Sequence, residues 1–199
     1  MPHGDRGRTQ VALTFHTNGD RALVERLLEV VEARHVVVTA FIVGAWLDQN
    51  PDFAARLQHG GHELANHTYN HLTFANLDEA TKTAEVTRCR DVLARLSGSG
   101  GAYFRPSGTA NGVDVPGADV LRVAADAGYA IVAGYDVDPA DYADPGSTAV
   151  VQRTLGAVQP GSIVSLHFGH QGTIDALPAI IDGVRARHLE PVTMTALLS

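Results

Sequence analysis

Short runs of apolar and β-branched residues alternate along the chain with longer segments in which apolar residues recur every three or four positions. The short runs are typical of buried strands, and the longer spacing is typical of amphipathic helices. Seven strands are predicted, at residues 11–15, 36–43, 63–66, 102–105, 129–135, 163–168 and 191–195. Helical stripes of apolar residues lie between them, at 23–31, 86–96 and 174–184.

Strands that alternate with helices lie mostly parallel, because a helical crossover is what connects parallel neighbours. The pattern therefore predicts one α/β domain over residues 1–199, with a barrel favoured over an open sheet. Residues 1–9 are expected to be a disordered tail or an expression-derived extension. The irregular segment 106–116 is long, and long loops are more often functional than idle.

Composition narrows the classes of function. A net charge of −7 without a basic run argues against nucleic acid or an anionic membrane as partner. A single cysteine, Cys89, excludes an intrachain disulfide and cysteine-based zinc or iron–sulfur sites, whereas ten histidines are unusual. No protein partner is indicated. The sequence has no run of 18 apolar residues and no secretory signal. The protein is therefore expected to be either cytoplasmic or a trimmed domain of a secreted or cell-envelope protein.

Candidate chemistry gathers where the predicted strands end. Reactive residues in parallel α/β folds collect at the carboxyl ends of strands. Five of the seven predicted strand ends carry His, Asp or Arg, within residues 16–20, 67–71, 105–108, 136–142 and 167–170. The sequence therefore predicts a cluster of reactive side chains at one edge of the sheet.

His67 and His71 are four residues apart, so a helical turn would aim both imidazoles at one point, as a divalent metal requires. Zinc is the natural occupant, with cobalt or nickel as alternatives. The structural alternative is a capped turn with one buried and one surface histidine.

His167 ends a strand, a position suited to a general acid. Asp138 and Asp141 follow another strand, and a carboxylate beside an imidazole raises the imidazole pKa and fixes its orientation. Arg105 is an isolated cation that can stabilise developing negative charge. The structural alternatives are a hydrogen-bonded strand-end histidine, a turn at Asp138-Pro139, and a salt bridge of Arg105.

Six segments carry a resemblance that covers nearly the whole chain. VALTF, VTAFIVG, GGHELANHTYNH, YFRPSG, YDVDPADY and IVSLHFGH follow one another as the motifs of the polysaccharide deacetylase family, carbohydrate esterase family 4, do. The resemblance implies a distorted β/α barrel that binds one divalent metal and removes acetyl groups from sugars. It implies that His67 and His71 ligate the metal and that His167 is the general acid. It further implies that Asp138 tunes that acid and Arg105 holds the catalytic carboxylate.

The first motif departs from this family pattern. Thr-Phe-Asp-Asp-Gly is expected, with a general base and a third metal ligand, whereas the chain reads Thr14-Phe15-His16-Thr17-Asn18-Gly19-Asp20. Three outcomes stay open: His16 is the third ligand; Asp20 is the ligand while His16 is the base, although Asp20 also suits a helix cap; or the site has lost its metal and its catalysis. Tyr142 replaces the usual Trp, and Tyr142 and Phe168 are the predicted substrate contacts.

The sequence thus predicts a metal-dependent hydrolase that removes acetyl groups from amide or ester positions of a carbohydrate. Two alternatives remain. One is a catalytically inactive carbohydrate-binding pseudoenzyme, which the changed first motif favours. The other is a deacylase that acts on a non-polysaccharide amide, since fold does not fix substrate.

Overall fold

A computed structural model describes residues 1–109 and 112–199 of the chain. The strands are β1 (Gln10–Thr17), β2 (Thr39–Ile42), β3 (Glu63–Asn66), β4 (Tyr103–Phe104), β5 (Ile131–Val132), β6 (Ile163–His167) and β7 (Glu190–Val192). The helices are α1 (Arg21–Glu32), α2 (Gly44–Gln49), α3 (Asp52–His59), α4 (Glu79–Ser97), α5 (Ala118–Asp126), α6 (Ser147–Ala157), α7 (Gln171–Arg185) and α8 (Met194–Leu198), with 3₁₀ turns η1 (Phe74–Asn76) and η2 (Asp141–Ala143).

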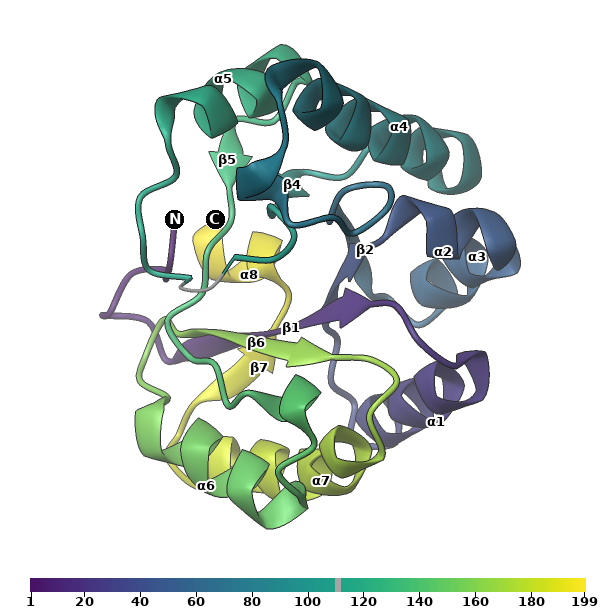
Figure 1. The fold of residues 1–199 in the computed structure, drawn as a ribbon. Helices are drawn as coiled ribbons and strands as arrows, with labels where there is room; N and C mark the ends of the chain where they lie inside the picture. Colours follow the sequence, from purple (N-terminus) through teal and green to yellow (C-terminus); the bar gives the residue numbers. More distant parts are fainter. Residues whose placement is uncertain (110–111) are drawn as a thin grey trace.

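The strands form one sheet in the order β5-β4-β3-β2-β1-β6, with β7 also paired to β1, and every ladder is parallel. The segment after β5 returns to β6 through a parallel bridge between Val137 and Val164. The sheet therefore curls into a distorted barrel with helices around it (Figure 1). This α/β architecture confirms the predicted fold class.

The helices cover the sheet with the apolar stripes that the sequence predicted. In α1 the buried residues Val24, Leu27, Leu28 and Val31 recur every three or four positions. Each such side chain contributes roughly 1.5–3 kcal/mol when it leaves water. The long helix α4 begins at the Asp78 cap, whose carboxylate accepts from Thr81 N at 2.7 Å, and ends at Gly98 in the left-handed region (φ 80°).

Five predicted strands are shorter than expected. In the two that shorten most, backbone groups bond elsewhere. The prediction at 36–43 contracts to β2, since Val36 N still donates to Val31 O and closes the turn after α1. The prediction at 129–135 contracts to β5. Beyond it, Gly134 N donates to Met1 O at 2.7 Å and Tyr135 N to Gly112 O at 3.1 Å, so loop segments replace the ladder.

The first nine residues are not a disordered tail. His3 forms an antiparallel bridge with Ser162, and Gly4 N donates to Gly161 O at 2.8 Å. The Met1 ammonium donates to Val132 O at 2.7 Å. The expectation was wrong because the backbone groups of this polar segment find partners at the sheet edge.

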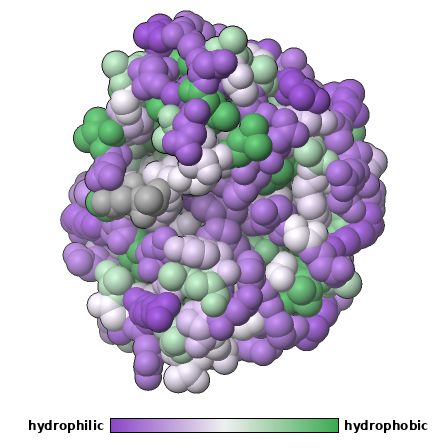
Figure 2. Space-filling view, viewed as in Figure 1, coloured by the Kyte–Doolittle hydropathy of each residue, from purple (hydrophilic) through white to green (hydrophobic). Residues whose placement is uncertain are grey.

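The surface is mostly hydrophilic, and hydrophobic residues stand in small separate groups on the face drawn in Figure 2. Within residues 1–109 and 112–199, no helix is both long and apolar enough to cross a membrane.

Candidate functional site

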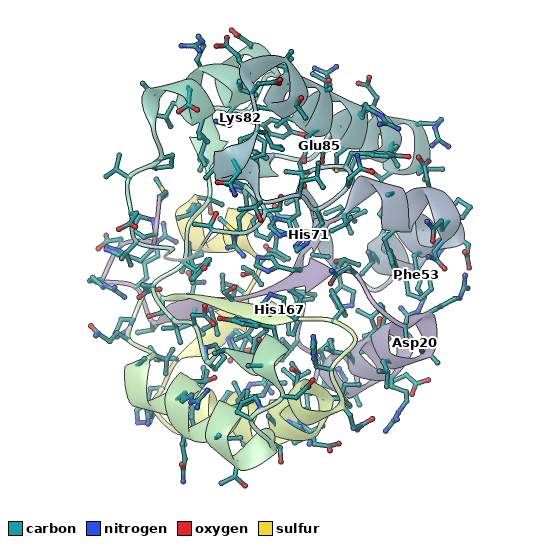
Figure 3. The ribbon with its side chains drawn as sticks, viewed as in Figure 1. Asp20, Phe53, His71, Lys82, Glu85 and His167 are labelled. Atoms are coloured by element: carbon teal, nitrogen blue, oxygen red, sulfur yellow. The ribbon has the colours of Figure 1, made fainter. Side chains whose placement is uncertain are left out.

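A cavity of about 390 Å³ opens at the carboxyl ends of the strands. The pairing register sets His16 on β1 beside His167 on β6. Figure 3 shows His71 and His167 facing the middle of the molecule, whereas Asp20 lies apart at the start of α1. The titratable residues that line the cavity are His16, His67, His71, Arg105, Asp138, Tyr135, Tyr142, His167 and His170. The predicted cluster at one edge of the sheet is therefore present.

His16 bridges Arg105 and His167. Arg105 Nη1 lies 3.1 Å from His16 Nε2, and His16 Nδ1 lies 2.9 Å from His167 Nε2. A guanidinium only donates, so His16 Nε2 must be the acceptor and its proton must sit on Nδ1. His16 therefore donates to His167 Nε2, and both of its nitrogens are used.

The same reasoning fixes the tautomer of His167. Its Nδ1 lies 2.8 Å from Asp141 Oδ1, so the neutral ring carries its proton on Nδ1 and donates it to the carboxylate. Asp141 is 1% exposed and also accepts from His167 N at 2.8 Å and Thr173 Oγ1 at 2.7 Å. These bonds hold the Asp141 carboxylate in place beside the His167 ring.

Asp138 does not perform the contact predicted for it. Its carboxylate accepts from Ala140 N at 2.8 Å in a local turn, while it lines the cavity away from His167 Nδ1. The carboxylate that orients His167 is Asp141. The structure places it there because Ala140 adopts a left-handed conformation (φ 53°) and η2 then turns Asp141 inward.

The floor of the cavity is a buried cation. Arg105 is 1% exposed and donates to Thr14 Oγ1 at 2.9 Å and Gly134 O at 2.8 Å, with its guanidinium carbon 3.9 Å from the centre of the Phe41 ring. No carboxylate of the described residues forms a salt bridge with it. Burial lowers the pKa of Arg105 to about 9. The carboxylate that the family motif expects beside this arginine is replaced by His16.

Burial also keeps the central imidazoles neutral. It lowers the pKa of His16 well below 6.5, with His67 and His167 adding like-charge repulsion. Burial lowers the pKa of His67 in the same way, with His71 as the next cause, and that of His71 less strongly. Neutral imidazole is the form that binds metals or accepts protons.

The loop that carries His67 and His71 is not the helical turn that was predicted. Thr68 (φ 68°) and His71 (φ 58°) are left-handed, yet the two imidazole centres lie 5.0 Å apart. His67 Nδ1 donates to Arg105 O at 2.8 Å, which leaves its Nε2 lone pair unprotonated. His67 and His71 thus lie close together, as expected of two ligands.

The residues present do not complete a metal site. His16 stacks on His67 with ring centres 4.1 Å apart and planes 12° from parallel. A ligand lone pair lies in the plane of its ring, so two stacked rings cannot both point at one ion at the usual distance of about 2.0–2.1 Å. In the part of the chain that the structure describes, no three His, Cys, Asp or Glu side chains are grouped to hold a metal ion.

Asp20 does not supply the missing ligand. Its Oδ1 accepts from Ala22 N at 2.8 Å and Leu23 N at 3.2 Å, which makes it the cap of α1. It is exposed and lines a separate surface depression. The structure therefore agrees with the interpretation of Asp20 as a helix cap and not with its interpretation as a metal ligand.

The two residues predicted to contact the substrate lie in different surroundings. Tyr142 is 54% exposed at the cavity, with its ring 5.2 Å from that of His167. Phe168 is 1% exposed and packs on Phe15 at 5.1 Å in the core, so it cannot contact a substrate. The prediction for Phe168 was wrong because Phe168 lies in the turn just after β6 and packs into the core, whereas His167 at the strand end faces the cavity.

Comparison with known proteins decides the family. The sequence profile of the family named polysaccharide deacetylase matches residues 3–132. This chain belongs to the polysaccharide deacetylase family.

Relatives of this polysaccharide deacetylase family member include two curated bacterial proteins. A chitooligosaccharide deacetylase from Bradyrhizobium is 33% identical over 171 residues, covering 84% of this chain and 75% of the relative. A peptidoglycan-N-acetylglucosamine deacetylase from Bacillus cereus is 27% identical over 202 residues, covering 98% of this chain and 70% of the relative. Carbohydrate deacetylases are therefore among the relatives.

Solved structures share the fold. The Bc1960 peptidoglycan N-acetylglucosamine deacetylase superimposes with a TM-score of 0.90 at 23% identity, over 99% of this chain and 91% of that one. BA3943, a CE4 family pseudoenzyme from Bacillus anthracis, also gives 0.90, at 22% identity, over 100% of this chain and 68% of that one. The backbone fold alone therefore does not separate a protein named as a deacetylase from one named as a pseudoenzyme.

Sequence reasoning missed one residue that supports the deacetylase motif. Glu85 of α4 is 3% exposed and accepts from Tyr69 N at 3.1 Å, Asn70 N at 2.7 Å and Asn70 Nδ2 at 2.6 Å. It therefore holds the loop between His67 and His71 (Figure 3). A usable signal existed, because Glu85 lies on the apolar stripe of its helix next to Val86.

Proposed function

We propose that this protein hydrolyses the acetamido group of an N-acetylated amino sugar within an oligosaccharide or polysaccharide. The curated relatives are deacetylases of chitooligosaccharides and of peptidoglycan. The observation that carries the proposal is the pairing of His167 with the buried carboxylate of Asp141 at the cavity. An imidazole oriented in this way suits proton transfer to a leaving amine.

The reaction adds water to the acetamido carbon and breaks the C–N bond, giving acetate and a free amine. The leaving nitrogen needs a proton, and His167 supplies it from Nε2 once the ring is protonated. Asp141 stabilises that imidazolium through Nδ1. Because His16 donates to the same Nε2, the bond between the two rings must open before His167 can act.

The chain offers two imidazoles, His67 and His71, to a divalent cation, and among residues 1–109 and 112–199 no third side chain joins them. Acetate release with and without added zinc, cobalt or nickel tests metal dependence. Buried Arg105 supplies fixed positive charge at the cavity floor, where negative charge develops on the carbonyl oxygen.

A second candidate is a carbohydrate-binding protein without hydrolysis. Two observations favour it. His167 Nε2 is already bonded to His16. Thr17, which stands where the family motif has its second Asp, is fully buried with its Oγ1 lacking a hydrogen-bond partner among the described residues. In this case the cavity would bind a sugar and leave it unchanged.

One experiment separates the two candidates. The purified protein is incubated with N-acetylglucosamine oligomers, peptidoglycan and a non-sugar acetamide, with and without zinc, cobalt or nickel, and released acetate is measured. The proposal expects acetate release that His167→Ala abolishes and His59→Ala, a change on the exposed end of α3, leaves intact. Sugar binding by calorimetry without acetate release would establish the second candidate instead.

A further inference from the structure

A second His–Asp pair lies beside the first and has no assigned role. His170 Nδ1 lies 2.9 Å from Asp144 Oδ1. The pair repeats the His167–Asp141 pair three residues further along both segments, and the two imidazole centres are 6.2 Å apart. His170 lines the same cavity. We propose that His170, oriented by Asp144, is a catalytic residue that accepts the proton of the attacking water, an inference that rests on the proposed function.

The hydrogen bonds of the cavity favour His170 over its neighbours. His16 uses both ring nitrogens, and His167 Nε2 accepts from His16. His67 has an open Nε2, but no carboxylate of the described residues orients its ring or would stabilise its protonated form, since its Nδ1 donates to a carbonyl. His170 combines a carboxylate partner at Nδ1 with an Nε2 for which the described residues provide no bond.

The position of His170 also suits exchange of protons with solvent. Its side chain is 25% exposed against 15% for His167, and its partner Asp144 is 69% exposed whereas Asp141 is fully buried. The first motif of this chain has lost the carboxylate that the family uses as base, and His16 in its place is occupied. A general base is therefore needed elsewhere in the cavity, and His170 is available.

Solvent supplies the proton that His167 donates and takes up the proton that His170 accepts. His170 Nε2 takes a proton from water as the oxygen bonds to the acetamido carbon. Protonated His167 then gives its Nε2 proton to the nitrogen as the C–N bond breaks, which releases acetic acid and the amine. His170 returns its proton to solvent, and His167 takes one back.

The test compares His170→Gln and Asp144→Asn with the wild type and with the remote control His59→Gln. His170→Gln is expected to lower kcat about 100-fold with little change in KM, and Asp144→Asn about tenfold, because a base acts on the chemical step. Both positions are partly exposed, so folding should be retained, which circular dichroism checks.

A second readout does not depend on turnover. Diethyl pyrocarbonate labels open neutral imidazole nitrogens, and mass spectrometry locates the label. His170 should be labelled, and a saturating N-acetylglucosamine oligomer should protect it while His59 stays labelled. Full activity of His170→Gln in an active enzyme overturns this inference and leaves the proposed function standing. Labelling of His170 that the sugar does not change also overturns it. Absence of turnover in the wild type overturns the proposed function and, with it, the catalytic role.

Discussion

The two sides of the cavity differ in how fully their hydrogen bonds are used. On the β6 side, both nitrogens of His167 have partners, and Asp141 accepts three bonds. On the β3 side, His67 is fixed through Nδ1 alone and faces His71, and the described part of the chain adds no third ligand. The side that we propose for proton transfer is therefore preassembled, whereas the side with the two candidate metal ligands is incomplete. His16 connects the two sides, because its ring stacks on His67 and donates a hydrogen bond to His167.

The largest effect on turnover is expected from a change of Asp141, on the β6 side of the cavity. Asp141→Asn removes the negative charge. It also places an amide N–H against one of the groups from which Asp141 now accepts a hydrogen bond. The tautomer of His167 then changes, so turnover should fall about 1000-fold. Acetate release measures this, and Asp182→Asn, an exposed change on α7, is the matched control. Turnover near that of the wild type would remove His167–Asp141 from the mechanism.

Changing His16 tests whether the link between the two sides restrains the enzyme. His16→Asp frees His167 Nε2 and places a carboxylate beside the unpaired Arg105, where it can act as base. Turnover should rise about 100-fold. His16→Asn frees the same nitrogen without adding a base and separates the two contributions. A loss of turnover in both variants would show instead that His16 itself takes part in the reaction.

The imidazoles of the incomplete side and of His16 should make stability depend on pH. Their folded-state pKa values lie below the unfolded value of about 6.5, so the unfolded chain binds more protons as pH falls. The free energy of unfolding should then decrease below about pH 6.5, by about 2.7 kcal/mol per pH unit for His16 and His67 together. Urea unfolding at several pH values measures this slope, and His16→Asn should reduce it by about half.

Glu85 tests how rigidly the incomplete side is held. Glu85→Ala leaves the backbone N–H groups of Tyr69 and Asn70 without their acceptor, which should cost about 2 kcal/mol of stability. The ring resonances of His71 should also shift, as ¹H–¹⁵N spectra report. Glu79→Ala removes an exposed ion pair on the same helix and should cost well under about 1 kcal/mol. Equal losses in the two variants would mean that Glu85 does not hold the loop.

The sequence predicted the parallel α/β fold because apolar periodicity separates strands from helices without knowledge of their packing. It also identified the strand ends that form the cavity. The resemblance assigned the tuning role to Asp138, whereas the structure pairs His167 with Asp141. Both residues follow β5, and only the left-handed turn at Ala140 decides which one faces inward. It could not foresee that His16 stacks parallel to His67, because ring orientation depends on bonds to Arg105 and His167.

Asp20 gives the smallest predicted effect and separates a helix cap from a metal ligand. Its side chain accepts from Ala22 N and Leu23 N, so Asp20→Ala should cost about 1 kcal/mol of stability. Asp78→Ala removes the equivalent cap of α4 and should cost a similar amount. Because Asp20 lies outside the cavity, neither variant should change acetate release or the binding of added zinc measured by calorimetry. A loss of zinc binding in Asp20→Ala alone would return Asp20 to the ligand set and make the β3 side of the cavity a complete metal site.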